Sequence, residues 1–128
     1  MIDHIGFTVE DFDAALAFYT SALAPIGIAP VLTITPEQSG GGAHAGFGTP
    51  DRPFFWIGSE GRAGGGTHVA FTVETRALVD AFHRAAIGAG GQDNGGPGLR
   101  PHYHEHYYGA FVRDADGNNI EAVCHRAE

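Results

Sequence analysis

The chain has 128 residues, the length of one ordinary domain, and 43% of them are hydrophobic, which is enough to form a core. Its net charge is -8 and all seven basic residues are arginines, so it has no basic stripe that could neutralise the phosphates of a nucleic acid. The same acidity disfavours binding to an anionic membrane surface, and no apolar run reaches the roughly 18 residues that a membrane helix needs.

Cysteine use and the first residues bear on the compartment. Cys124 is the only cysteine, so no internal disulfide can form. The chain starts with Met1-Ile2-Asp3-His4, which has an acid where a signal peptide would have positive charge. We therefore expect a cytoplasmic protein. Together with the acidity of the chain, this leaves a small molecule as the expected partner and excludes a nucleic acid or a membrane.

The first predicted strand returns later in the chain as a near copy. Residues 4–10 read His-Ile-Gly-Phe-Thr-Val-Glu, and residues 68–74 read His-Val-Ala-Phe-Thr-Val-Glu. The two segments are 64 positions apart, which is half the chain. Repetition at this distance indicates two copies of one structural unit, so we expect one domain, residues 1–128, made of modules at about 1–62 and 63–128.

An amphipathic helix is predicted after each copy. Residues 12–23 have apolar side chains at helical spacing, and Asp11 can cap the N-terminus of this helix. The second helix has Thr75 as its expected cap and Gly88 or Gly90 as its expected end.

Three more strands are predicted in each half. They cover residues 27–35, 43–48 and 53–58 in the first half, and residues 92–95, 107–113 and 118–124 in the second. Asp116-Gly117 between the last two strands is a strong hairpin signal. Residues 38–42 and 95–106 are expected to be irregular. The order is therefore β-α-β-β-β, twice, in an α+β fold.

Strand alternation predicts which face the histidines occupy. His4 and His68 share a face with Gly, Ala and Thr residues, and such a small, polar face is typical of a cavity lining rather than of a core. Glu121 lies in an otherwise apolar strand, where it is costly unless it has a partner. Two imidazoles and one carboxylate suggest a site for Zn, Fe, Mn or Ni. Alternatively, each histidine is an ordinary surface residue.

Three motifs resemble those of the vicinal-oxygen-chelate superfamily, which contains the glyoxalases, the bleomycin-resistance proteins and the extradiol dioxygenases. They are residues 2–9, residues 67–71 and the hairpin of residues 114–121. The hairpin is similar to the family signature D-P-D-G-N-x-x-E, with Ala115 in place of the usual proline. The resemblance covers essentially the whole chain and implies a small glyoxalase-like member.

The resemblance implies a cupped mixed sheet with the helices on its outer face and a metal at its centre. The ligands would be His4, His68 and Glu121. Glyoxalase I relatives often add a ligand from the last strand of the first module. The 64-residue offset predicts Ile57 at that place, with Trp56 and Gly58 beside it, and none of the three can bind a metal; the nearest carboxylate is Glu60, expected past the strand. The remaining two-histidine, one-carboxylate set is similar to that of the extradiol dioxygenases and the fosfomycin-resistance transferases.

Residues 102–108, His-Tyr-His-Glu-His-Tyr-Tyr, form the densest polar and aromatic cluster of the sequence. As a loop over the cavity mouth, this segment would let His104 or Tyr107 supply an acid, a base or a hydrogen bond. The other interpretation is an exposed histidine-rich loop. By resemblance, Glu121 is a third candidate catalytic group, as a proton carrier.

Two functions follow from the resemblance. The first is a metal-dependent enzyme of glyoxalase-like type (a lyase, an isomerase, a dioxygenase or a thiol transferase) acting on a small substrate with vicinal oxygens. The second is a metal-free protein of the bleomycin-resistance type that sequesters a hydrophobic or cationic ligand, which the net charge of -8 would attract. For either function the resemblance implies a homodimer, because the family commonly builds its cup by pairing modules within or between chains. The sequence leaves open which of the two arrangements applies.

Overall fold

The computed structural model describes residues 1–128, and its elements form two modules with the same order. The first module contains β1 (Ile5–Thr8), α1 (Phe12–Leu23), a short 3-10 helix (Ala24–Ile26), β2 (Ala29–Ile34), α2 (Pro36–Ser39), β3 (His44–Thr49) and β4 (Arg52–Gly58). The second contains β5 (His68–Thr72), α3 (Arg76–Gly88), β6 (Gln92–Leu99), β7 (Tyr108–Arg113) and β8 (Asn119–Cys124). The predicted β-α-β-β-β repeat is confirmed.

Each module builds one four-stranded mixed sheet, with the strand order β1-β4-β3-β2 in the first and β5-β8-β7-β6 in the second. The first strand of each module runs parallel to the last, and the other neighbours are antiparallel. A parallel pair needs a crossover connection, and the long helix of each module provides it. The predicted α+β class is therefore confirmed.

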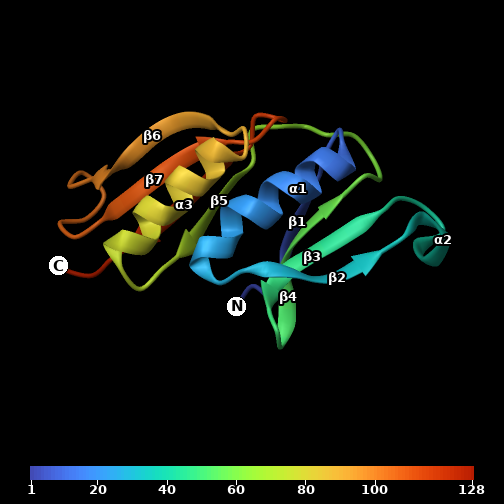
Figure 1. Ribbon diagram of the computed structural model, residues 1–128, viewed down its shortest axis with the longest axis horizontal. Helices are drawn as coiled ribbons and strands as arrows, with labels where there is room; N and C mark the ends of the chain where they lie inside the picture. The colour runs from blue at the N-terminus through green and yellow to red at the C-terminus, as the bar shows by residue number, and fades with distance from the viewer.

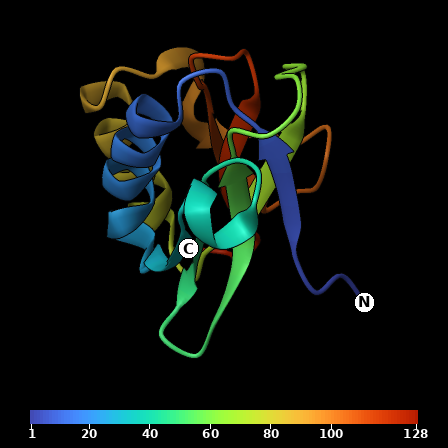
Figure 2. The same cartoon turned by 90° about the vertical axis from the view of Figure 1, so that its right-hand side faces the viewer.

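The two long helices begin where the sequence predicts. The Asp11 side chain accepts a hydrogen bond from the backbone N–H of Ala14, and the Thr75 side chain accepts one from Leu78. Figure 1 shows α1 and α3 side by side, and Figure 2 shows both on one side of the strands, so the other face of each sheet has no helix over it. No helix of the structure has the length and hydropathy needed to cross a bilayer.

The core lies between the helices and the sheets. The ring centroid of Phe55 in β4 is 5.1 Å from that of Tyr19 in α1 and 5.4 Å from that of Phe71 in β5. Because Phe71 belongs to the second module, these edge-on contacts join the two modules in a single core.

Two segments expected to be irregular are partly ordered. Thr35 and Gln38 form a capping box that starts the short helix α2, and strand β6 extends to Leu99 instead of ending near residue 95. The second half of β6 is not predicted from the sequence, because the glycines and the proline of this strand are typical of loops. Its pairing with β7 survives through two shifts of register, on either side of Gly95.

Candidate functional site

Glu121 lies on the helix-free face of the second sheet, although only 1% of its surface is exposed. Its Oε1 is 3.0 Å from Nε2 of His68, and its Oε2 accepts a hydrogen bond from the hydroxyl of Tyr107. A Cβ atom at Gly109 would lie 3.0 Å from the same Oε2, so this glycine leaves room for the carboxylate. Both oxygens of the buried carboxylate thus have a hydrogen-bonding partner, which offsets the cost of burying it.

Two side-chain amides orient the ring of His68. Asn119 Nδ2 lies 2.7 Å from His68 Nδ1, and Asn94 donates to the Asn119 side-chain oxygen at 3.1 Å. With Nδ1 accepting, the proton of the neutral ring sits on Nε2 and points to Glu121. His68 therefore presents Nε2 at the same point as the Glu121 carboxylate.

Tyr107 immediately precedes β7 and completes the group. Burial raises the pKa of its hydroxyl, and the hydrogen bond to Glu121 and the charge of that carboxylate raise it further. The hydroxyl therefore remains a neutral donor at physiological pH. The structure thus brings together three of the predicted site residues, His68, Tyr107 and Glu121.

His104 lies at the rim of this group. It is exposed, and its Nδ1 accepts a hydrogen bond from the backbone N–H of His106. Its ring centroid is 5.9 Å from that of His125, which in turn lies 5.1 Å from that of Tyr107. The side chains of His125 and Tyr107 therefore lie between His104 and Glu121. The catalytic role of His104 stays a prediction.

His4 lies apart from the other predicted ligands. It comes just before β1, in the other sheet, its side chain is 59% exposed, and its Nδ1 is 2.7 Å from a carboxylate oxygen of Asp3. No group of three histidine, cysteine or acidic side chains within the single chain converges to hold a metal ion. The chain by itself therefore brings two of the three predicted ligands together, His68 and Glu121.

The counterpart of Glu121 in the first module is Trp56, and the expectation of Ile57 is wrong. Gly6 of β1 pairs with Trp56 in the register in which Ala70 of β5 pairs with Glu121. The offset is 64 residues at the first strand but 65 at the last, because the second module has one more residue between them. Ile57 is instead fully buried in the core.

The chemistry of the pair fits a divalent metal. Imidazole nitrogen and carboxylate oxygen are ligands of Zn, Fe, Mn and Ni, and ligand distances of about 2.0–2.2 Å at a right angle would separate the two donor atoms by about 3 Å. The 3.0 Å between His68 Nε2 and Glu121 Oε1 matches that spacing. These two residues would supply two ligands of a site that needs at least one more from outside this group.

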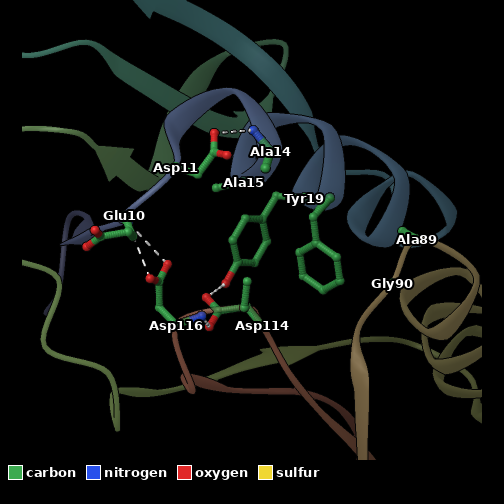
Figure 3. A pocket seen from close by; sticks show the side chains of 11 residues that line it. Glu10, Asp11, Ala14, Ala15, Tyr19, Ala89, Gly90, Asp114 and Asp116 are labelled. Atoms are coloured by element: carbon green, nitrogen blue, oxygen red, sulfur yellow. Dashed lines mark hydrogen bonds between the residues drawn. The ribbon is translucent and has the colours of Figure 1, made fainter.

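A separate cavity of about 320 Å³ lies on the helix side, between the start of α1 and the turn from β7 to β8 (Figure 3). At its wall the hydroxyl of Tyr19 donates to the buried Asp114, which also accepts a hydrogen bond from the side chain of Asn118. None of the predicted ligands lines this cavity. The network fixes the turn and is distinct from the Glu121 group.

Comparisons with known proteins agree on the fold. A family model described as Glyoxalase/Bleomycin resistance protein/Dioxygenase superfamily matches residues 1–122. A glyoxalase/bleomycin resistance protein from Albidiferax ferrireducens T118 is 27% identical, with a TM-score of 0.81 over 97% of this chain and 98% of that one. A glyoxylase/bleomycin resistance protein/dioxygenase domain from Frankia sp. EAN1pec is 18% identical, with a TM-score of 0.74 over 98% of both chains.

Larger proteins contain the fold as well. Glyoxalase I from Zea mays is 21% identical, with a TM-score of 0.69, and the match covers 99% of this chain and 45% of that one. No curated protein sequence matches the chain. With a family model that spans nearly the whole sequence and the two-module fold that the structure shows, the chain belongs to the glyoxalase/bleomycin resistance protein/dioxygenase superfamily.

Proposed function

We propose that two copies of the chain form a metal-dependent enzyme acting on a small substrate with vicinal oxygens. His68 and Glu121 of one copy and His4 of the other would hold a divalent metal. The observation that supports this most is the 3.0 Å approach of His68 to a carboxylate that is 1% exposed. An imidazole nitrogen and a carboxylate oxygen that meet at one point are ligands that such metals take.

A second copy is proposed because the surface around His4 is open and apolar. Met1, Ile2 and Ile5 are exposed around this residue, and a groove of about 370 Å³ beside it runs along β5 of the second module. Exposed apolar side chains that gather at one place are typical of an interface. In a two-fold dimer, each copy would offer His4 to the partner and receive the partner's histidine in return.

The bound metal would polarise the two oxygens of the substrate and stabilise negative charge that develops on them. The chain's own residues would do the rest. Tyr107 holds the second carboxylate oxygen of Glu121 by its hydroxyl, so it fixes the direction of the carboxylate. Glu121 would then accept a proton from the substrate, and His104 at the rim would act as an acid or base toward a part of the substrate that reaches it.

The alternative is a metal-free binding protein. Trp56 stands where a fourth ligand would stand, and it offers an aromatic surface instead of a donor atom. This favours sequestration of a ligand if the chain takes up no metal.

Metal analysis of the purified protein separates the two. After loading with each of Zn, Fe, Mn and Ni, we expect stoichiometric binding of at least one ion, lost in His68→Ala and in His4→Ala. Uptake of none of these ions under any loading condition would overturn the proposed metal enzyme and support the metal-free binding protein.

A further inference from the structure

The helix-free face of the first sheet has a hollow of about 230 Å³, with Trp56 on one side and His44 and Glu60 on another. Gly6 and Gly58 also line it. No predicted ligand lines this hollow. It is therefore a feature of the first module alone, distinct from the Glu121 group of the second.

Glycines on both neighbouring strands make room for the indole of Trp56. A Cβ at Gly46 would come within 2.8 Å of the indole atom Cζ2, and a Cβ at Gly6 within 2.9 Å of the Trp56 Cβ. Real Cβ atoms do not approach this closely, so any larger residue at Gly46 would displace the ring. The indole thus lies over the backbone of β3. Part of it remains exposed, and it lines the hollow.

The other end of the hollow is polar and acidic. Glu60 Oε2 lies 3.6 Å from Nε2 of His44, and the Glu60 side chain is 62% exposed. The hydroxyl of Thr8 donates to the backbone carbonyl of Glu60 at 2.9 Å, which holds this residue at the edge of the hollow. A Cβ at Gly58 would lie 2.6 Å from His44 Nδ1, so Gly58 is what admits the imidazole.

We propose that this hollow is a subsite for a planar aromatic group with a positively charged amine, the ring packed on Trp56 and the amine at Glu60. A flat ring gains from an aromatic partner beyond the area that it buries, and an ammonium is attracted both by the carboxylate and by the indole face. The net charge of -8 and the absence of lysine favour a cation over an anion. This inference deepens the proposed function by naming part of the substrate, since Trp56 occupies the position equivalent to Glu121.

The chain has one tryptophan, so its intrinsic fluorescence reports on Trp56 alone. We would titrate the metal-free protein with benzylamine and with cyclohexanemethylamine, which has the same charge and nearly the same size but no flat ring. We expect benzylamine to change the emission saturably and to bind about tenfold more tightly. Calorimetry should show that Trp56→Phe retains the preference for benzylamine, that Trp56→Leu abolishes it, and that Glu60→Gln weakens benzylamine binding up to about fivefold.

Equal affinity for the two amines, an unchanged emission, or a preference that survives Trp56→Leu in a folded protein would overturn the subsite. Circular dichroism of each variant establishes that it is folded. Because the titration uses metal-free protein, it does not depend on the metal. A chain that prefers benzylamine but takes up no metal retains the subsite and loses the proposed enzyme, and a chain that binds metal without this preference does the reverse.

Discussion

Trp56 and Glu121 lie at the same position of the two modules, each beside the small residue of its parallel partner strand, Gly6 for the tryptophan and Ala70 for the glutamate. The two modules have therefore diverged at one equivalent place. One offers an aromatic surface and the other a buried carboxylate with a histidine 3.0 Å away. If two copies meet through their helix-free faces, these different surfaces come to line a common cavity.

Replacing Glu121 by glutamine should abolish metal binding with little effect on the fold. The amide oxygen can accept the hydrogen bond of His68 while the amide nitrogen donates to the hydroxyl oxygen of Tyr107, so we expect thermal stability near that of the unchanged protein. A neutral amide is a poor ligand for Zn, Fe, Mn and Ni ions, so the bound metal should fall from stoichiometric to trace amounts. Elemental analysis after loading and dialysis measures this.

The matched control is Glu74→Gln, which removes an exposed carboxylate that pairs with Arg126. This variant should retain its metal. A Glu121→Gln protein that is folded and still binds one ion per site would contradict the role of Glu121.

Asn119 should act as a positioning residue for His68. Its amide lies 2.7 Å from Nδ1 of the ring. When Nε2 binds a metal, the ring proton moves to Nδ1, and the Asn119 amide can turn its oxygen to accept it; groups that orient a ligating histidine in this way contribute about 10–100-fold to metal affinity. We therefore expect Asn119→Leu to weaken metal binding by about this factor without removing a ligand. Nitrogen NMR of the metal-free protein should show a mixture of His68 tautomers in the variant, and an unchanged tautomer with unchanged affinity would exclude the role.

Much of the fold follows from the sequence because the repeat of residues 4–10 at residues 68–74 gives the module twice. The caps Asp11 and Thr75 follow from side-chain chemistry alone. The second half of strand β6, after residue 95, does not follow from the sequence, because pairing with β7 overrides the loop-like composition of its residues.

The candidate site is predictable from the sequence only in part. His68 and Glu121 share a face by simple alternation, and their closeness follows from the parallel pairing of β5 with β8. The equivalence of Trp56 and Glu121 is not predicted from the sequence, because one extra residue in the second module changes the offset between equivalent positions from 64 to 65. Only the register of the folded strands shows this change. The distance of His4 from the pair depends on how the modules pack, which no local pattern encodes.

Replacing Asp116 by asparagine should stabilise the protein near neutral pH. Burial raises the pKa of Asp116, and the nearby carboxylates of Asp114, Glu10 and Asp11 raise it further, while a hydrogen bond from the backbone of Glu10 opposes them. A raised folded-state pKa means that the protonated form is the one favoured by folding. That contribution is fully present below the ordinary value of 3.8 and is lost as the pH rises through the folded-state value.

The asparagine variant should accordingly melt at a higher temperature than the unchanged protein at pH 7, and this advantage should shrink as the pH falls through the raised folded-state pKa and be gone below 3.8. Thermal unfolding followed by circular dichroism across that pH range gives the comparison. An advantage that grows toward acid would show that the sign of the shift is wrong.

Tyr19→Phe should destabilise the protein without affecting the metal. The hydroxyl donates to Asp114, which is 8% exposed and loses one of its partners in the variant. Loss of such a buried hydrogen bond costs about 1–2 kcal/mol. Urea unfolding should show that decrease, and metal content should stay unchanged, because Tyr19 lines the helix-side cavity and not the Glu121 group. A simultaneous loss of metal would show that the two regions are coupled.

The central claim, a metal held by His4 of one copy and by His68 and Glu121 of another, is tested most directly by mixing two inactive variants. Neither His4→Ala nor His68→Ala alone should bind metal. Unfolded together in equal amounts and refolded, they should recover about a quarter of the unchanged protein's metal per chain, because half of the two-fold dimers are mixed and each mixed dimer has one intact site. Recovery of no metal from a mixture that forms mixed dimers would contradict the shared site.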